Sequence, residues 1–205
     1  MSGTASALRF LPPGVCLDVD AGGHVFLRHP PLPQLRGVCY GRRDDDPPPG
    51  AHAQAAQALC ASHPQLLRLP LLSSPARRCR GLAEALRAHV GDGAARCDPR
   101  LREMDFGAWE GQRWDALPRA ALDRWAADVA GFRPPGGESF RDLVARVDDC
   151  LRTLDRPHLI VAHAGVIRAA AHLLGGLALT DAAAVEVPYL LPTTVVGPDT
   201  AARPD

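Results

Sequence analysis

The chain has 205 residues, of which 46% are hydrophobic and 22% are charged, proportions typical of an ordinary globular protein. Basic and acidic residues number 23 each, so the formal net charge of zero gives no global attraction to nucleic acid or to a membrane surface. Every basic residue is arginine, which we attribute to the coding bias of a GC-rich genome, so that only the positions of arginines are informative. We expect a single domain over residues 1–205, with a core at about 24–196 between a peripheral N-terminal extension and a peripheral C-terminal tail.

The first twenty residues contain no apolar run of signal-peptide length, and no later stretch of ~18 uncharged apolar residues could cross a bilayer. We therefore expect a cytoplasmic protein without a membrane partner. The six cysteines are scattered without a C-x-x-C pair, which favours reduced thiols over disulfides or a zinc site.

Strand-like apolar runs alternate with helical patterns along the chain, which predicts an α/β domain with a largely parallel sheet. HVFLR at 24–28 predicts the first strand, and a proline-rich loop leads from it to a helix over 51–62. LLRLPLL at 66–72 predicts a short strand. These elements supply the first strands of the predicted sheet and one of the helices predicted to pack against it.

A strong helical pattern follows in SSPARRCRGLAEALRAHV at 73–90, with Ser74 as the N-cap, Pro75 as the first helical residue and an apolar stripe that ends at Val90. FRDLVARVDDCLRTL at 140–154 predicts a second amphipathic helix, which Ser139 and Asp142 begin as a capping box.

The last clear pattern, HLIVAHAGVIRAAAHLL at 158–174, predicts a buried strand through Ala162, a tight turn at Ala164 and Gly165, and a helix. We expect GPDTAARPD at 197–205 to be a mobile tail.

Polar residues follow three of the predicted strands at their carboxyl ends. Arg28 and His29 follow the first strand, Arg78 comes shortly after the second, and His163 follows the third. Because ligands bind at the carboxyl ends of parallel strands, we expect these residues to meet in one crevice. A guanidinium without a partner is costly to bury, so Arg28 must reach water, a carboxylate or an anionic ligand.

Arg77 and Arg78 fall in the first turn of a predicted helix, where the helix dipole disfavours a cation by about 0.3–1 kcal/mol. One interpretation places them, with Arg80, on a solvated face. The other places them beside an anion that the helix N–H groups and the guanidinium bind together, and the position of Arg28 favours it. The sequence therefore indicates a phosphate pocket.

Two histidines in a phosphate pocket, with no metal-ligand motif, indicate covalent catalysis by a neutral imidazole whose arginine neighbours neutralise the phosphoryl oxygens. Such a reaction also needs a proton donor for the leaving alkoxide. Glu103 and Asp105 lie in the apolar and aromatic stretch DPRLREMDFGAWEG at 98–111, where desolvation would keep a carboxyl protonated and able to act as a general acid. A solvated surface role is the alternative for Glu103.

The chain contains, in this order, LRH at 27–29, SSPARRCR at 73–80, LREMDFGAWEG at 101–111, PGGESF at 135–140 and VAHAGVIR at 161–168. Together these stretches resemble the motifs of the histidine phosphatase superfamily, the phosphoglycerate mutase-like fold. The resemblance implies a three-layer α/β/α sandwich with a mostly parallel central sheet.

The same resemblance assigns roles to the residues of the predicted crevice. It implies that His29 is the nucleophile that becomes phosphohistidine, and that Glu103 protonates the leaving group and then activates water. It further implies that Arg28, Arg78 and His163 hold the phosphoryl group.

GVCYGRRDDDP at 37–47 is similar to the CYGRxD loop of bacterial α-ribazole phosphatase-like members. This similarity implies that Arg42 is an additional phosphate ligand and that Asp44 anchors the loop, with a solvated loop arginine as the alternative for Arg42. The resemblance also places Ala164 and Glu138 among the substrate-binding and phosphate-binding residues.

The sequence departs from the family pattern directly after the predicted nucleophile. Pro30 stands where glycine is usual, and PLPQL at 31–35 replaces the usual downstream Glu or Thr and Asn. Proline removes a backbone N–H and restricts His29 to an extended conformation, so the turn here differs from the glycine type.

These observations predict a phosphomonoesterase of the histidine acid phosphatase type, without a metal or other cofactor, that acts on a small phosphorylated metabolite such as α-ribazole 5′-phosphate. A phosphomutase is one alternative; hydrolysis is favoured because a mutase must exclude water with enclosing segments, of which this chain has few. A catalytically inactive phosphate-binding protein is the other. The net charge of zero argues against a nucleic-acid partner. A homodimer is possible, because the sequence does not indicate the oligomeric state.

Overall fold

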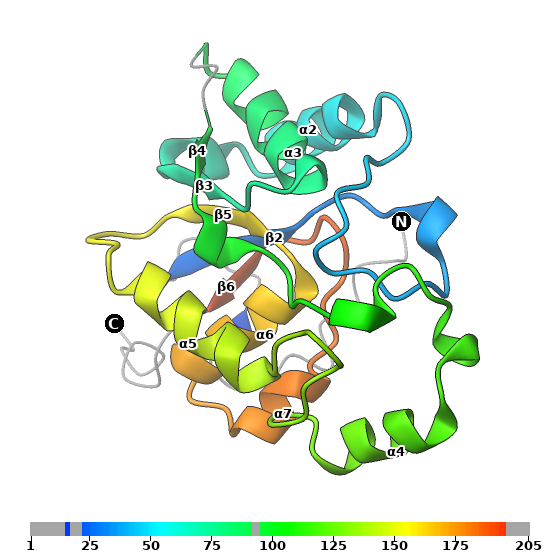
Figure 1. Cartoon of the computed structure of the whole chain (residues 1–205). Coiled ribbons are helices and arrows are strands. Elements are labelled where there is room, and N and C mark those ends of the chain that lie inside the picture. Colours follow the sequence, from blue (N-terminus) through cyan, green and yellow to red (C-terminus); the bar gives the residue numbers. More distant parts are fainter. Residues whose placement is uncertain (1–14, 17–21, 92–94, 196–205) are drawn as a thin grey trace.

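The computed structural model describes residues 15–16, 22–91 and 95–195, and their strands form one sheet in the order β1-β6-β2-β5-β3-β4 (Figure 1). The strands are β1 Val15–Cys16, β2 His24–Arg28, β3 Leu71–Ser73, β4 Arg96–Cys97, β5 Leu159–Ala162 and β6 Thr193–Val195. The pairs β2–β5, β5–β3 and β3–β4 are parallel, whereas β6 is antiparallel to both β1 and β2. The prediction of a mostly parallel sheet is confirmed.

Side chains alternate along the central strands and so build a hydrophobic core on each face of the sheet. The helices are α2 Ala51–Ser62, α3 Arg77–Ala88, α4 Arg119–Ala127, α5 Phe140–Leu151, α6 Ala164–Leu173 and α7 Leu179–Ala184. From β2, Val25 and Leu27 pack with the helices α2 and α3, whereas Phe26 packs with α5 and α6. Figure 1 shows α2 and α3 on one side of the sheet and α5, α6 and α7 on the other, which confirms the α/β/α sandwich.

An aromatic cluster lies outside these two cores, in the segment between β4 and α5. It consists of Phe106, Trp109, Trp114, Trp125 and Phe132, and Cys39 packs against it. Short 3-10 helices carry part of this cluster and of the loops: Pro33–Leu35, Pro64–Arg68, Pro99–Leu101, Gly107–Trp109 and Trp114–Ala116. The tryptophans thus pack together rather than lie along a basic surface.

Several predicted elements lie where the sequence pattern placed them. The strand over 24–28, the helix over 51–62 and the capping box of Ser139 and Asp142 are confirmed. The strand predicted over 66–72 is wrong in its first part, because Pro64–Arg68 form a 3-10 helix and β3 begins only at Leu71. Pro64 suits the first position of that helix, since its missing N–H is not needed there.

The helix predicted over 73–90 begins later, at Arg77, and its N-cap is Ala76 rather than Ser74. The Ser74 hydroxyl is 2.8 Å from Nε2 of His163 and therefore joins two strand ends instead of capping a helix. Val90 lies beyond the end of α3 and is 44% exposed, so the apolar stripe ends before it.

The tight turn predicted at Ala164 and Gly165 is also wrong. Helix α6 begins directly at Ala164, and His163, in an extended conformation, is its N-cap. Strand β5 is therefore joined to α6 through His163 alone.

Strands β1, β4 and β6 are absent from the predicted elements. Each has only two or three residues, which is too short for a two-residue periodicity to be visible in the sequence. Val15 pairs with Val195, so part of the segment predicted to be peripheral belongs to the sheet edge. The tail predicted at 197–205 lies outside the described residues, and no helix among the described ones has the length and apolar character needed to span a bilayer.

Candidate active site

The carboxyl ends of β2, β3 and β5 converge at one edge of the sheet, as predicted. Strand β5 lies between the other two, and it pairs with Arg28 on one side and with Ser73 on the other. The residues that follow β2 and β5, His29 and His163, have ring centroids 5.3 Å apart. A cavity of about 590 Å³, called the main cavity here, is lined at this edge by Arg28, His29, Glu103 and Ala164 among others.

His29 is buried and neutral, with one ring nitrogen committed to the backbone. Its Nδ1 is 2.7 Å from the carbonyl oxygen of Pro30, and because a carbonyl only accepts, Nδ1 carries the proton. Burial lowers the pKa of His29 well below its ordinary value, and the Arg78 guanidinium lowers it further. Nε2 therefore keeps its lone pair at neutral pH and can act as a nucleophile. Pro30 thus supplies the acceptor that sets the tautomer.

His163 is fully buried beside His29 and is not itself among the residues that line the main cavity. Its Nε2 lies 2.8 Å from Oγ of Ser74. Burial, with Arg78 and His29 adding to it, lowers the pKa of His163 well below the ordinary histidine value. Both imidazoles at this strand edge are therefore neutral at pH 7.

Arg78 is the charge for which the described residues provide no counter-charge. Its side chain is 0% exposed, and its guanidinium donates to the backbone carbonyls of Gly41 and Arg43. Its Nε is buried without a hydrogen-bond partner, and no carboxylate in the described part of the chain pairs with it. A buried guanidinium without an anion is costly, so the geometry favours an anionic ligand, and a solvated face is wrong for Arg78.

Arg77 differs from its neighbour. Its guanidinium forms an ion pair with Asp46, and its backbone N–H donates to Oδ1 of Asp44 at 2.6 Å. Arg77 is therefore paired with a carboxylate of the loop, and the anion predicted beside both arginines is needed only by Arg78. Asp44 joins the loop to the beginning of α3, which agrees with the role of a loop anchor.

Arg28 lines the main cavity together with Tyr189. Its Nη1 donates to the carbonyl of Val187 at 2.7 Å, and its guanidinium carbon lies 3.6 Å from the centroid of the Tyr189 ring. The same ring packs edge-on against His29 at 5.6 Å. Tyr189 was not predicted, because a lone tyrosine in VPYLL carries no motif.

Glu103 reaches from the loop after β4 to the beginning of α6. Its Oε1 accepts from the N–H of Met104 at 2.9 Å, and its Oε2 accepts from the N–H of Gly165 at 3.1 Å. Glu103 is half-buried and lines the main cavity, so the alternative of a solvated surface glutamate is wrong. The carboxyl is placed in the same cavity as the ring of His29.

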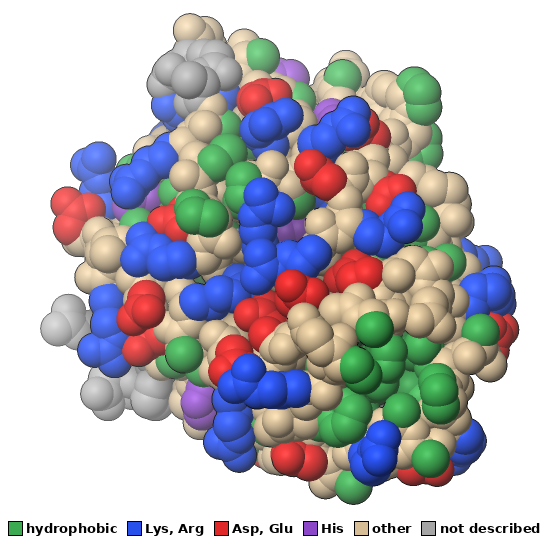
Figure 2. All heavy atoms as spheres, in the orientation of Figure 1, with side chains coloured by type: hydrophobic (Ala, Val, Ile, Leu, Met, Phe, Trp, Pro, Cys, Tyr) green, Lys and Arg blue, Asp and Glu red, His purple; other side chains and the backbone are tan. Residues whose placement is uncertain are grey.

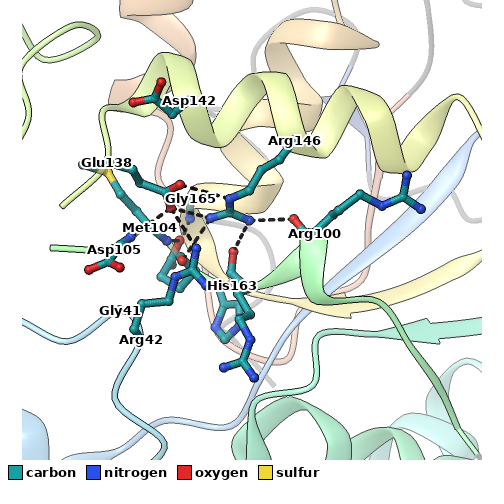
Figure 3. Close-up of polar contacts among 12 residues, drawn as sticks. Gly41, Arg42, Arg100, Met104, Asp105, Glu138, Asp142, Arg146, His163 and Gly165 are labelled. Carbon is teal, nitrogen blue, oxygen red and sulfur yellow. Dashed lines mark hydrogen bonds and ion pairs between the residues drawn. The ribbon is translucent and has the colours of Figure 1, made fainter. Parts of the chain in front are cut away.

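Arg146 of α5 holds the segment that carries Glu103 (Figure 3). Its guanidinium donates to the carbonyls of Arg100 and Arg102, at 2.6 Å each, and of Glu103, at 3.0 Å. The remaining donors contact the Glu138 carboxylate at 2.6 and 3.1 Å. The sequence carries only a weak sign of this role, namely a charged residue that borders the apolar stripe of an amphipathic helix.

Of the further binding residues predicted, Ala164 lines the main cavity, whereas Arg42 and Glu138 do not. Glu138 accepts from Arg146 and from the N–H of Asp105 at 2.9 Å, and Arg42 lies 3.5 Å from the same carboxylate. Figure 3 shows these side chains pointing toward one another. They connect the CYGR loop with the segment that carries Glu103.

Two further residues were not predicted. Arg168, one helical turn after Ala164 and therefore on the same face of α6, lines the main cavity and donates to the carbonyl of Val185 at 2.8 Å. Glu110 accepts from the N–H groups of Gly41 and Arg42, each at 2.9 Å, and so fixes the loop whose carbonyls hold Arg78. Among the described residues, no three His, Cys, Asp or Glu side chains are grouped as a metal site.

Comparison with known proteins agrees with this geometry. The model of the histidine phosphatase superfamily (branch 1) matches residues 25–200. A curated protein of Hydrogenobacter thermophilus, named "Putative phosphoserine phosphatase 2", is 32% identical over 154 residues, which are 71% of this chain and 74% of that protein.

Solved structures show the same similarity. A mycobacterial glucosyl-3-phosphoglycerate phosphatase aligns with a TM-score of 0.65 and 31% identity, over 80% of this chain and 84% of that one. A phosphoglycerate mutase from Thermus thermophilus aligns with a TM-score of 0.60 and 34% identity, over 74% of this chain and 83% of that one. Proteins named as phosphatases and as mutases thus share this fold.

Proposed function

Since this chain belongs to the histidine phosphatase superfamily, branch 1, we propose that it hydrolyses phosphate monoesters through a phosphohistidine at His29. The observation that carries the proposal is the buried Arg78, which has no carboxylate partner among the described residues and lies close enough to His29 and His163 to lower their pKa values. A dianionic phosphoryl group would supply the charge that Arg78 lacks.

The residues of the main cavity, together with the buried Arg78 and His163 beside it, account for both halves of the reaction. In the first half, the Nε2 lone pair of His29 attacks phosphorus, the bond to the leaving oxygen breaks, and that oxygen takes the proton of Glu103. In the second half, the Glu103 carboxylate takes a proton from water, and the water oxygen attacks phosphorus. The P–N bond then breaks, its electron pair returns to Nε2, and inorganic phosphate leaves. Arg28, Arg78 and His163 hold the phosphoryl oxygens throughout.

We propose a small phosphorylated metabolite as the substrate. The main cavity of about 590 Å³ lies within the usual range for small-molecule sites. The CYGR loop makes α-ribazole 5′-phosphate one candidate, and the names of the relatives add phosphoserine and glucosyl-3-phosphoglycerate. The chain's own residues supply the nucleophile and the acid, so no metal is required in this proposal.

A phosphomutase is the second candidate, because a mutase is among the similar solved structures. A mutase would be primed by a bisphosphorylated cofactor and would transfer its phosphoryl group to a second substrate molecule faster than to water. We propose hydrolysis as the main reaction, and the ratio of released phosphate to transferred phosphoryl group separates the two.

The test is a panel of phosphorylated metabolites, including the three named above, assayed for phosphate release with a chelator present. We expect the wild type to release phosphate and His29→Ala to lose at least about 10³-fold in kcat/KM. His89→Ala, which changes an exposed histidine at the end of α3, is the matched control and should match the wild type. If the wild type and both variants bind phosphate but none of them hydrolyses any ester, the result would instead support a catalytically inactive phosphate-binding protein.

A further inference from the structure

A second cavity of about 160 Å³, called the annex here, adjoins the main cavity. The two cavities share Glu103, Phe106, Trp114 and Arg168 as lining residues. In the proposed reaction Glu103 delivers its proton to the leaving oxygen, so the leaving alcohol must lie next to Glu103. The annex is therefore in reach of the part of the substrate that departs with that oxygen.

The walls of the annex are mainly apolar and aromatic. The rings of Trp114 and Trp125 stack with centroids 5.5 Å apart and an angle of 10° between their planes, and Phe106 packs edge-on against both. Val129 and Ala183 add aliphatic surface. Figure 2 shows hydrophobic side chains gathered at the lower right, in the region between α7 and α4 of Figure 1. Aromatic walls of this kind favour a planar ring over a hydrated, flexible chain.

The size of the annex agrees with one such ring. An apolar protein cavity of about 150 Å³ binds a benzene molecule, and the annex has about 160 Å³. A larger ring system would have to extend back into the main cavity past Phe106 and Trp114, which both cavities share.

The indole Nε1–H of Trp125 is buried without accessible surface and has no hydrogen-bond partner among the described residues, so it does not open into the annex. Trp125 therefore contributes ring atoms to the annex wall rather than a hydrogen-bond donor.

We propose that the annex binds a planar ring of the leaving alcohol. This inference rests on the proposed function and narrows it. The substrate class is phosphate monoesters of alcohols that bear an aromatic or heteroaromatic ring.

Two substrates with alcohols of similar acidity test the proposal: glycerol 3-phosphate and benzyl phosphate. For the wild type we expect kcat/KM to rise at least about tenfold from glycerol 3-phosphate to benzyl phosphate, because a ring is buried.

Two variants fill the annex from different elements. Ala183→Phe fills it from α7 and should remove the preference for benzyl phosphate over glycerol 3-phosphate, and Val129→Phe should do the same from the segment after α4. The preference is the ratio of the two kcat/KM values within one variant, and thermal unfolding shows whether that variant is folded.

A direct readout completes the test. In a ¹⁵N spectrum, the indole signal that Trp125→Phe deletes should shift on titration with benzyl alcohol and stay unmoved on titration with glycerol, because Trp125 lines the annex. Turnover of both esters with equal kcat/KM, together with an unmoved indole signal, would overturn the annex proposal and leave the proposed function intact. Absence of any turnover would overturn the proposed function, and the indole signal alone would then decide whether the annex binds a ring.

Discussion

Gly165 and Glu103 show how closely the residues of the site depend on one another. The Gly165 N–H donates to Glu103, and a Cβ on Gly165 would collide with Oε1 of the same carboxylate and, less severely, with Cδ2 of Leu143. Glycine at this position therefore leaves the space that the proposed general acid occupies. The side chain of Glu103 is flexible, so a collision would move the carboxyl more readily than it would disrupt the helix.

We predict that Gly165→Ala lowers kcat for alkyl phosphates by at least about tenfold, since general acid catalysis contributes about 10²–10⁴ in rate. The free energy of unfolding should change by no more than about 1 kcal/mol, because alanine suits a helix. 4-Nitrophenyl phosphate, whose leaving group needs no proton, should be affected much less. When Gly165→Ala is added to Glu103→Gln, we expect little further loss in kcat. If the double variant instead shows the full additional loss in kcat, Gly165 does not act through Glu103.

The residues that sequence patterns could predict are those to which the proposed chemistry assigns a direct role. Arg28, His29, Arg78, Glu103 and His163 follow strands or lie in motifs, and the structure brings them to one sheet edge. Arg146, Glu110, Arg168 and Tyr189 were missed because their roles come from hydrogen bonds and ring contacts to distant segments. Such contacts leave no spacing in the sequence, since the partners are brought together only by the fold.

At the scale of elements, α5 is both a core helix and the support of the Glu103 segment. Its capping box fixes where the helix begins, and its apolar face packs in the core on the α6 side. That placement directs Arg146 toward the carbonyls of Arg100, Arg102 and Glu103. The helix thereby couples packing to the position of the proposed acid.

We predict that Arg146→Met lowers the free energy of unfolding by about 3 kcal/mol, because it removes the shorter of the two ion pairs of Glu138 and the donor of three carbonyls. In kinetics it should lower kcat more than it raises KM, since Glu103 is displaced while Arg28 and Arg78 stay. Urea unfolding and steady-state kinetics measure the two effects.

Arg141→Met is the matched control on the same helix, because Arg141 is exposed. It should change the free energy of unfolding by no more than about 0.5 kcal/mol. Equal behaviour of the two variants would contradict the positioning role of Arg146.

Among the elements, long amphipathic helices and the fully buried strands were predictable, whereas the short edge strands were not. Helix α5 shows its period over several turns, and β2 and β5 are continuous apolar runs. Strand β4 has two residues and β6 has three, and each is a strand only because a neighbouring strand pairs with it. The start of α3 was misplaced because Ser74 looks like an N-cap while its hydroxyl contacts His163.

At the scale of the whole molecule, two buried neutral histidines couple stability to pH. Burial holds the pKa values of His29 and His163 below 6.5 in the folded protein. Above pH 6.5 these side chains are neutral in both states, and the stability that depends on them is fully present. As pH falls below 6.5, the unfolded chain binds protons that the folded protein does not, so this stability is lost until the folded pKa values are reached.

We predict that the free energy of unfolding, measured in urea between about pH 7 and about pH 5.5, falls on acidification, with these two histidines contributing up to about 2.7 kcal/mol per pH unit. His29→Gln should reduce that slope by about half of this contribution. If the free energy of unfolding changes with pH in the same way in the wild type and in His29→Gln, folding does not lower the pKa of His29.

The covalent step at His29 is the point on which the proposed chemistry depends, and it can be observed directly. The enzyme is mixed with a ³²P-labelled monoester that it hydrolyses, and the reaction is quenched in base during turnover. The protein is then digested, and the labelled peptide is identified by mass spectrometry. We predict an acid-labile, base-stable phosphoryl group on the peptide that contains His29, formed at a rate no slower than kcat. A phosphoryl group on another residue, or steady turnover with an unmodified His29 at every quench time, would contradict it.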